Sequence, residues 1–242
     1  MTFQVGIVAT DGVILASDTR VTQIEGQAAF STAEGQRLFS DSWKIVVYDD
    51  APRLAYCWAG DQLQTRIAHD FGDSVRKQKT TLTFQEIREV LTRNATSALS
   101  ALYPGYPFQL PQGTQALPRK HTGGSVLAAY PGPSGVELWK LRVDNVVDAF
   151  TVRDKTAAGD MVNPAVFFLE KYYRPSTIEK LLPLAAHTIL MGSALSSSAV
   201  NGLEIATCRN DRFERLPVEE ITELIQFSQK LDRSISALLP WH

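Results

Sequence analysis

The chain lacks the sequence features of several large classes of protein. Its 242 residues include only two cysteines, Cys57 and Cys208, which are too few for a disulfide framework or a cysteine zinc site. The four histidines show no metal-ligand spacing, so we expect neither a metal nor a cofactor. No phosphate loop, dinucleotide fingerprint, HExxH helix or GxSxG elbow occurs. A histidine-dependent serine or cysteine hydrolase stays open as an alternative, although no pattern locates its residues.

Excess positive charge and long apolar runs are also missing. The 24 basic and 26 acidic residues give a formal charge of -2, which argues against a nucleic-acid or anionic-membrane partner. No stretch approaches the roughly 18 apolar residues of a membrane span. The first residues lack a basic leader, and Asp11 and Asp18 interrupt the early apolar residues. We therefore expect a cytoplasmic protein, and its 44% hydrophobic residues are sufficient for a sizeable core.

Alternating apolar residues predict two β-hairpins within the first sixty positions. The first joins 3–9 to 13–16 through the turn Asp11-Gly12, and the second joins 44–48 to 54–58. Between them, the polar segment 23–42 is predicted to be an extended loop or an irregular hairpin.

Apolar residues at helical spacing then predict two helices, on either side of residue 80. Thr83 is a predicted N-cap of the second helix, with Glu86 three residues later completing a capping box. The second half of the chain repeats this plan, with predicted strands at 124–130, 136–141, 146–152, 203–208 and 213–216 and helices beginning near 163, 176 and 217.

Runs of strands that alternate with runs of helices predict an α+β fold rather than a parallel α/β sheet. Amphipathic helices are available to cover both sides of the strands. We therefore expect one domain over residues 1–242, built as a four-layer αββα sandwich with two stacked antiparallel sheets between helical layers.

The distinctive chemical feature is Thr2, which stands directly before the first predicted strand. A methionine before a small residue is normally removed, which would leave a threonine whose own α-amine lies beside its hydroxyl. An α-amine has a pKa near 8, so it can act as a base at neutral pH. Such a pair is the threonine form of N-terminal nucleophilic catalysis. Taken alone, Met-Thr at the start of a chain is a common and unspecific pattern.

Further motifs follow Thr2 in a fixed order over the first sixty residues. Residues 16–20 read Ala-Ser-Asp-Thr-Arg at the end of the second strand, Lys44 heads the next strand, and Ala59-Gly60 ends the strand after it. This series resembles the start of mature proteasome beta-type subunits, and the chain is identified as a bacterial proteasome-related homologue. The spacing from Thr2 to Asp18 matches that family without a gap.

The resemblance implies a role for four residues. Once Met1 is removed, Thr2 would be the nucleophile and its freed amine the proton acceptor, through an ordered water. Lys44 would lower the pKa of the threonine hydroxyl, Asp18 would pair with Lys44, and the Gly60 N–H would stabilise the oxyanion. Taken one at a time, Lys44 also fits an ordinary strand, Asp18 a loop cap and Gly60 a turn.

The resemblance also implies positions that bind substrate. Thr22 falls where backbone atoms hold an extended substrate. Trp58 and Gln62 fall where the family shapes its S1 pocket, and a tryptophan there would favour smaller substrate side chains. Trp58 is equally well interpreted as a core residue.

The sequence departs from the family pattern in three places. The segment before Lys44 is longer than in the family. Asp160 stands where the family has a supporting serine, and we expect Asp160 to substitute as the polar partner. Ser198 matches a later serine, but Leu195 stands where the family has an aspartate.

These implications predict a threonine-type endopeptidase that assembles into a homo-oligomeric ring or double ring with its sites inside. Expected partners are unfolded polypeptides or peptides, and an ATP-dependent unfoldase that controls access. Two alternatives stay open, namely a non-catalytic structural ring subunit and an amidohydrolase that uses the same nucleophile on small amides. With Met1 attached, Thr2 has no free amine and the chain would be an inactive precursor.

Overall fold

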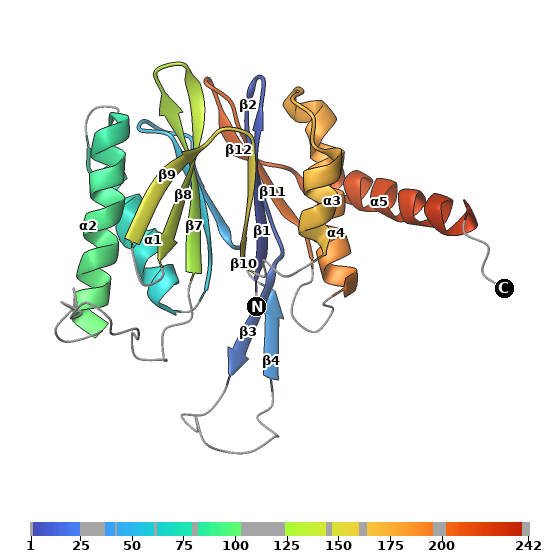
Figure 1. The fold of residues 1–242 in the computed structure, drawn as a ribbon, viewed down its shortest axis with the longest axis horizontal. Coiled ribbons are helices and arrows are strands. Elements are labelled where there is room, and N and C mark those ends of the chain that lie inside the picture. The colour runs from blue at the N-terminus through green and yellow to red at the C-terminus, as the bar shows by residue number, and fades with distance from the viewer. Residues whose placement is uncertain are drawn as a thin grey trace, which may run out of the picture.

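A computed structural model of the chain describes two sheets stacked face to face and covered by helices on both outer sides (Figure 1). The described residues are 2–24, 37–41, 43–60, 62–78, 82–102, 124–143, 147–159, 164–195 and 202–238. Both large sheets are five-stranded and antiparallel, and α1 and α2 lie on one side of the pair while α3 and α4 lie on the other. This arrangement confirms the predicted α+β sandwich of two antiparallel sheets between helical layers.

The first sheet is built around the predicted N-terminal hairpin, which is confirmed with Gln4 opposite Ser17 and Ala9 opposite Gly12. Its strand order is β10-β1-β2-β11-β12. The strand β10 was not predicted, because its sequence Lys-Thr-Ala-Ala-Gly has no apolar alternation. The strands are β1 (Phe3–Ala9), β2 (Gly12–Ser17), β10 (Lys155–Gly159), β11 (Glu204–Cys208) and β12 (Phe213–Arg215).

The second sheet has the order β5-β6-β7-β8-β9, so consecutive strands along the chain are neighbours in space. It confirms the predicted pairing of the second hairpin, with Ile45 opposite Cys57. Its strands are β5 (Ile45–Tyr48), β6 (Leu54–Ala59), β7 (Gly124–Gly132), β8 (Gly135–Val143) and β9 (Val147–Val152).

A separate two-stranded ribbon lies within the segment predicted to be a loop or an irregular hairpin. Among the described strands, β3 (Arg20–Ile24) and β4 (Arg37–Asp41) pair only with each other, and they project from the end of the sandwich at which the N-terminus lies (Figure 1). The described part of the segment is therefore a hairpin ribbon.

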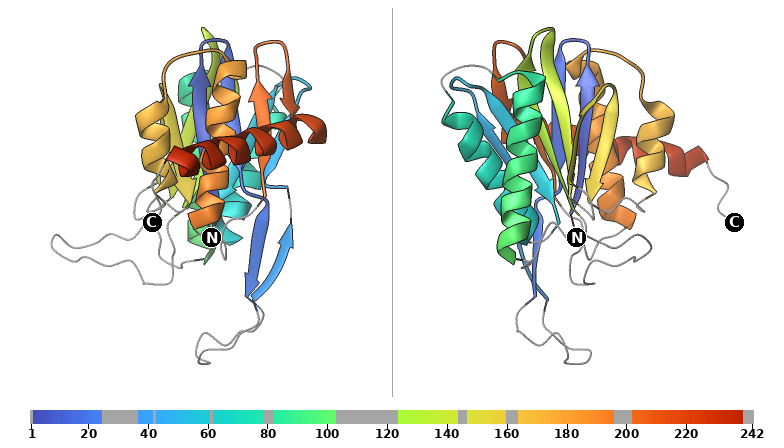
Figure 2. Two further views of the ribbon diagram at one scale, coloured as in Figure 1. Left: turned by 90° about the vertical axis from the view of Figure 1, so that its right-hand side faces the viewer. Right: turned by 60° about the vertical axis from the view of Figure 1, so that its left-hand side comes forward.

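The helices cover the outer faces of the two sheets. The capping box before α2 is confirmed, because the Thr83 N–H donates to Glu86 Oε2 at 2.7 Å and the Glu86 N–H donates to Thr83 Oγ1 at 3.4 Å. The last helix, α5, crosses the outside of α4 and extends beyond the body (Figure 2). The helices are α1 (Gln62–Arg76), α2 (Phe84–Leu102), α3 (Ala165–Tyr172), α4 (Ile178–Leu195) and α5 (Val218–Leu238). Among the described residues, no helix is long and apolar enough to cross a membrane.

Three apolar clusters fill the spaces between the four layers. Alternation along β1 sends Phe3, Val5 and Ile7 toward α3 and α4, so its even-numbered residues face the second sheet. At Gly6 the sheets approach so closely that a Cβ there would lie 2.8 Å from Leu138 Cδ2. Thr2 and Gln4 belong to this even-numbered set, and they therefore project between the sheets at the end where β1 begins.

Candidate active site

Three of the predicted site residues meet between the two sheets. The Lys44 ammonium lies 3.2 Å from Thr2 Oγ1 and 2.8 Å from Asp18 Oδ2. Thr2 precedes β1 and Asp18 follows β2, whereas Lys44 precedes β5 of the facing sheet. The sandwich therefore brings together residues from three strand ends in one cluster of a hydroxyl, an ammonium and a carboxylate.

Asp18 holds both the Thr2 strand and Lys44 in place. Its Oδ1 accepts a hydrogen bond from the Phe3 N–H at 2.9 Å, and its own N–H donates to the Phe3 carbonyl at 3.2 Å. These bonds continue the β1–β2 ladder one residue beyond its last pair, Gln4 with Ser17. The carboxylate is fully buried, and its second oxygen is the one that contacts Lys44. Asp18 therefore fixes the distance between the start of β1 and the ammonium.

The Lys44 ammonium is a buried charge beside a hydroxyl. Only 7% of its side chain is exposed. Burial lowers the pKa of Lys44, and the attraction of Asp18 opposes this shift. A positive charge 3.2 Å from Thr2 Oγ1 favours the deprotonated form of that hydroxyl. The arrangement is therefore suited to activating a threonine oxygen as a nucleophile.

Two features hold the end of β6 against the start of β1. The buried Gln4 side chain donates from Nε2 to the Trp58 carbonyl at 2.8 Å and to Ser17 Oγ at 3.2 Å. Gly159 has φ +92°, and a Cβ there would lie 1.8 Å from the Thr2 carbonyl oxygen and 3.2 Å from Ala59 Cβ. Glycine is therefore required where β10, β1 and β6 converge.

Gly60 directly follows Ala59 and so lies at this same end of the sandwich. It has φ +139°, a backbone conformation that favours glycine. Its role as a backbone donor near Thr2 stays a prediction.

Glu204 belongs to the site but was not predicted from the sequence. It is the first residue of β11, is 1% exposed, and accepts hydrogen bonds at Oε2 from the backbone N–H groups of Lys44 at 2.8 Å and Ile45 at 3.1 Å. Its other oxygen lies 3.2 Å from Arg215 Nε. Burial raises the pKa of Glu204, while the two N–H donors and Arg215 oppose that shift. A single acidic residue inside the buried strand 203–208 was the available signal, because such charges are rarely buried without a partner.

For two of the three predicted substrate-binding residues, the structure describes the backbone but not the side chain. Thr22 lies on β3 opposite Phe39, and Gln62 is the first residue of α1, but both side chains lie outside the described set. Trp58 is partly buried on the outer face of β6, where its ring centroid is 4.8 Å from that of His69 on α1. Its contribution to a substrate pocket stays a prediction.

The two residues predicted to support the nucleophile, Asp160 and Ser198, lie outside the described residues. Within the described ranges, no group of three or more histidine, cysteine, aspartate or glutamate residues is arranged to hold a metal ion.

Comparisons with known proteins yield structural matches only. No protein-family model and no curated protein sequence matches the chain. Similar solved structures include Anbu (ancestral beta-subunit) from Yersinia bercovieri, with a TM-score of 0.70 and 12% identity over 99% of each chain. The helical assembly of the Anbu complex from Pseudomonas aeruginosa gives a TM-score of 0.69 and 10% identity, over 99% of this chain and 98% of that one. Anbu from Hyphomicrobium sp. strain MC1 gives a TM-score of 0.66 and 10% identity over 99% of each chain.

These matches correct the family expected from the sequence. The identification with proteasome beta-type subunits was wrong, because the similar structures are Anbu proteins, a proteasome-like but distinct group. The N-terminal motifs are compatible with the fold that the two groups have in common, and so they do not distinguish between them. At 10–12% identity the likeness shows the fold alone.

Proposed function

We propose that this chain is a threonine-type N-terminal-nucleophile hydrolase that cleaves peptide bonds once Met1 has been removed. The observation that carries the proposal is the buried Lys44 ammonium, which contacts both Thr2 Oγ1, at 3.2 Å, and Asp18 Oδ2, at 2.8 Å. A structural lysine needs only its carboxylate partner. The additional contact places the ammonium where it can activate the hydroxyl of Thr2.

In the proposed reaction, the hydroxyl oxygen of Thr2 attacks the carbonyl carbon of the substrate amide. Its proton passes to the freed α-amine, whose ordinary pKa near 8 leaves part of it neutral at physiological pH. The carbon–nitrogen bond of the substrate then breaks, the leaving amine takes the proton, and an ester to Thr2 remains. Water hydrolyses the ester in a second step that restores the hydroxyl and the amine.

Lys44 serves this reaction as a fixed positive charge and not as a base. The Asp18 carboxylate favours the ionised form of the ammonium, against the effect of burial, which lowers the pKa of Lys44. We propose that the Gly60 N–H stabilises the oxyanion that forms on the attacked carbonyl. Asp160 and Ser198 are proposed to support the nucleophile.

We further propose that substrate binds as an extended strand along Thr22, with a side-chain pocket near Trp58 and Gln62. The proposed working form is a homo-oligomeric assembly with enclosed sites, open or closed, fed with unfolded chains by an ATP-dependent partner. The support for assembly is the likeness in fold to a structure described as a helical assembly of the Anbu complex.

The direct test is covalent labelling. Purified protein is incubated with a peptide epoxyketone, which reacts with a threonine hydroxyl and its neighbouring free amine, and intact mass is measured. We expect one adduct on protein that lacks Met1. Thr2→Ala should give none, whereas Thr10→Ala, which changes an exposed threonine directly after β1, should label like the parent.

Other results of the labelling experiment would indicate a different function. Absence of an adduct on folded, fully Met1-free protein would reject the hydrolase and favour a non-catalytic structural subunit. An adduct that persists in Thr2→Ala would place the nucleophile elsewhere. Native mass measurement separates the assembly from a monomer, and a labelled monomer that prefers small amides to peptides would favour the amidohydrolase.

A further inference from the structure

We propose that Glu204 is a positioning residue that sets where the Lys44 ammonium lies against Thr2. Its carboxylate accepts hydrogen bonds from the backbone N–H groups of Lys44, at 2.8 Å, and Ile45, at 3.1 Å. Glu204 comes from β11 of the first sheet, whereas Lys44 introduces β5 of the second. Only the kinetic part of the test below rests on the proposed function of Thr2.

The start of β5 needs such a partner because β5 is the edge strand in the described order of its sheet. An edge strand presents backbone groups with no neighbouring strand. Here the Glu204 carboxylate takes two backbone N–H groups, and Arg215 Nη2 donates to the Ile45 carbonyl. The ion pair of Glu204 and Arg215 therefore replaces a missing strand at this edge.

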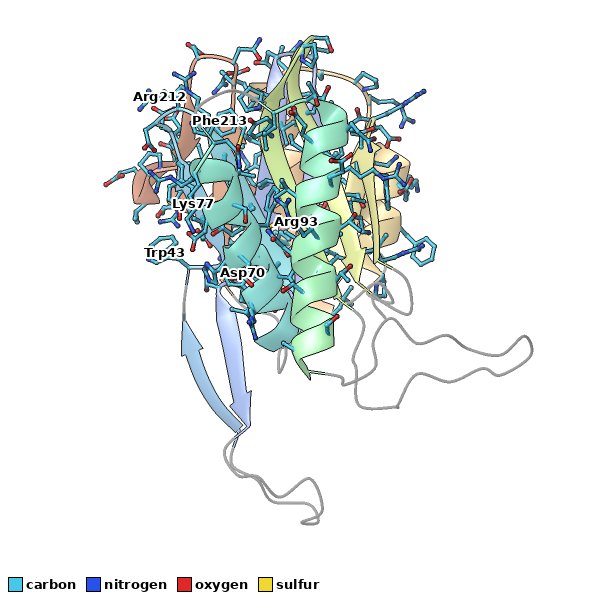
Figure 3. All side chains as sticks on the ribbon, turned by 90° about the vertical axis from the view of Figure 1, so that its left-hand side faces the viewer. Trp43, Asp70, Lys77, Arg93, Arg212 and Phe213 are labelled. Carbon is cyan, nitrogen blue, oxygen red and sulfur yellow. The ribbon has the colours of Figure 1, made fainter. Side chains whose placement is uncertain are left out.

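Arg215 is held in turn by the ring of Trp43. The guanidinium carbon lies 5.3 Å from the ring centroid. Figure 3 shows Trp43 at the edge of the body, beside the point where the β3–β4 ribbon departs, and the side chain is 61% exposed. The sequence of contacts runs from Trp43 through Arg215 and Glu204 to the Lys44 backbone.

The position of Lys44 depends on this anchor because its ammonium must meet two groups at once. Thr2 Oγ1 and Asp18 Oδ2 lie at 3.2 and 2.8 Å from it, so a shift of the Lys44 backbone separates the ammonium from at least one of them. In Glu204→Gln the amide oxygen can replace Oε2, but a neutral acceptor holds the two N–H groups less strongly than a carboxylate, and the amide nitrogen then faces Arg215. A misplacement on the order of 1 Å at a reacting group costs about 100-fold in rate.

The negative charge of Glu204 distinguishes its proposed role from a purely structural attachment of β5. The Glu204 carboxylate attracts the Lys44 ammonium and raises the pKa of Lys44 against the effect of burial. Glu204→Gln should therefore lower that pKa further, whereas mere loosening of the site would let water in and raise it. Arg215→Gln, which leaves the carboxylate uncompensated, should raise the pKa of Lys44.

The experiment compares the parent with Glu204→Gln, Arg215→Gln and the control Glu214→Gln. Glu214 is a carboxylate on the adjacent strand β12 that pairs with Arg212 at 2.6 Å. One readout is the pH titration of lysine ¹³Cε resonances, with Lys44 assigned from Lys44→Met. The other is the rate of Thr2 labelling by the epoxyketone, separated into the maximal rate and the half-saturating concentration.

In Glu204→Gln we expect a lower Lys44 titration midpoint and a maximal labelling rate reduced by up to about 100-fold, the cost of a misplacement on the order of 1 Å. The half-saturating concentration should stay unchanged, and Glu214→Gln should match the parent in both readouts. An unchanged or raised Lys44 midpoint in Glu204→Gln would overturn the proposal. If Glu204→Gln does not fold, Arg215→Gln provides the test. A Lys44 titration midpoint that does not rise in Arg215→Gln would then overturn the proposal. A lowered midpoint in Glu204→Gln, together with an unlabelled parent, would reject the hydrolase while retaining the positioning role.

Discussion

Replacing Asp18 by asparagine tests the buried ion pair while retaining the shape of the side chain. The amide oxygen of asparagine can still accept the Phe3 N–H bond that Asp18 accepts at 2.9 Å. The substitution removes the negative charge that faces Lys44 at 2.8 Å and replaces the oxygen that accepts from the ammonium by an amide NH2 group. The variant therefore removes the charge and the acceptor that Asp18 offers Lys44 while it retains the backbone anchor of β1.

The expected loss of stability follows from the burial of both partners. Their side chains are 7% and 0% exposed, for Lys44 and Asp18 respectively. Removal of one partner of such a pair costs about 3–5 kcal/mol, because the other charge stays buried without compensation. Since every 1.4 kcal/mol is tenfold, the ratio of folded to unfolded protein should fall roughly 100- to 4000-fold. Replacing both residues, in Asp18→Asn with Lys44→Met, should restore much of that stability.

Urea unfolding provides the measurement, with Asp50→Asn as the matched control. The pair of Arg76 with Asp50 has the same kind of contact, at 2.7 Å, but its side chains are 40% and 65% exposed. Its loss should cost about 1 kcal/mol or less. Asp18→Asn should also remove most Thr2 labelling.

The pH dependence has a defined sign. Without Asp18 the pKa of Lys44 falls further below its unfolded value of 10.5, so the unfolded chain binds more protons over the interval between the two. The stability of Asp18→Asn should therefore increase as the pH rises through that interval. A loss similar to that of the surface control, or a double variant as unstable as the sum of the singles, would refute the reasoning.

Two further predictions concern the surroundings of the site. In Gly159→Ala the new Cβ would lie 1.8 Å from the Thr2 carbonyl oxygen. In the control Gly135→Ala the nearest neighbour of the new Cβ would lie at 3.8 Å, so only backbone strain of roughly 1–3 kcal/mol is expected there. Urea unfolding should therefore show a larger loss of stability for Gly159→Ala than for Gly135→Ala. Thr2 labelling should fail in Gly159→Ala alone, and equal losses would contradict the prediction. Burial lowers the pKa of His187 from 6.5, so its contribution is present above pH 6.5 and is lost as the pH falls through the lowered folded value. Urea unfolding between pH 8 and 5 should be less pH-dependent in His187→Gln, and an unchanged dependence would reject this assignment.

Much of the fold could be predicted because its strands and helices have clear local patterns. The hairpin of β1 and β2 follows from alternation around Asp11-Gly12, and the start of α2 follows from Thr83 and Glu86. β10 could not be predicted in the same way. Its five residues have no pattern of their own and become a strand by pairing with β1 at the edge of the sheet.

Three residues of the site were predicted from the order of motifs along the chain. Thr2, Asp18 and Lys44 were expected together, and the geometry brings them together. The acidic residue in strand 203–208 could indicate a buried partner for Glu204 but not which one, because its contact with Lys44 arises from the pairing of β11 with β2. The same motifs led to the wrong family, since they are compatible with the fold of more than one group.

The separation of 160 residues between Lys44 and Glu204 has a consequence for biosynthesis. The β1–β2 hairpin can form from the first residues to leave the ribosome, because its contacts are local. Glu204, whose carboxylate anchors Lys44, is translated much later, after the strands and the helices of the intervening segments. A nascent chain that has not reached β11 therefore holds Thr2 and Asp18 without the complete anchor of Lys44. The full arrangement is delayed until most of the chain has been made.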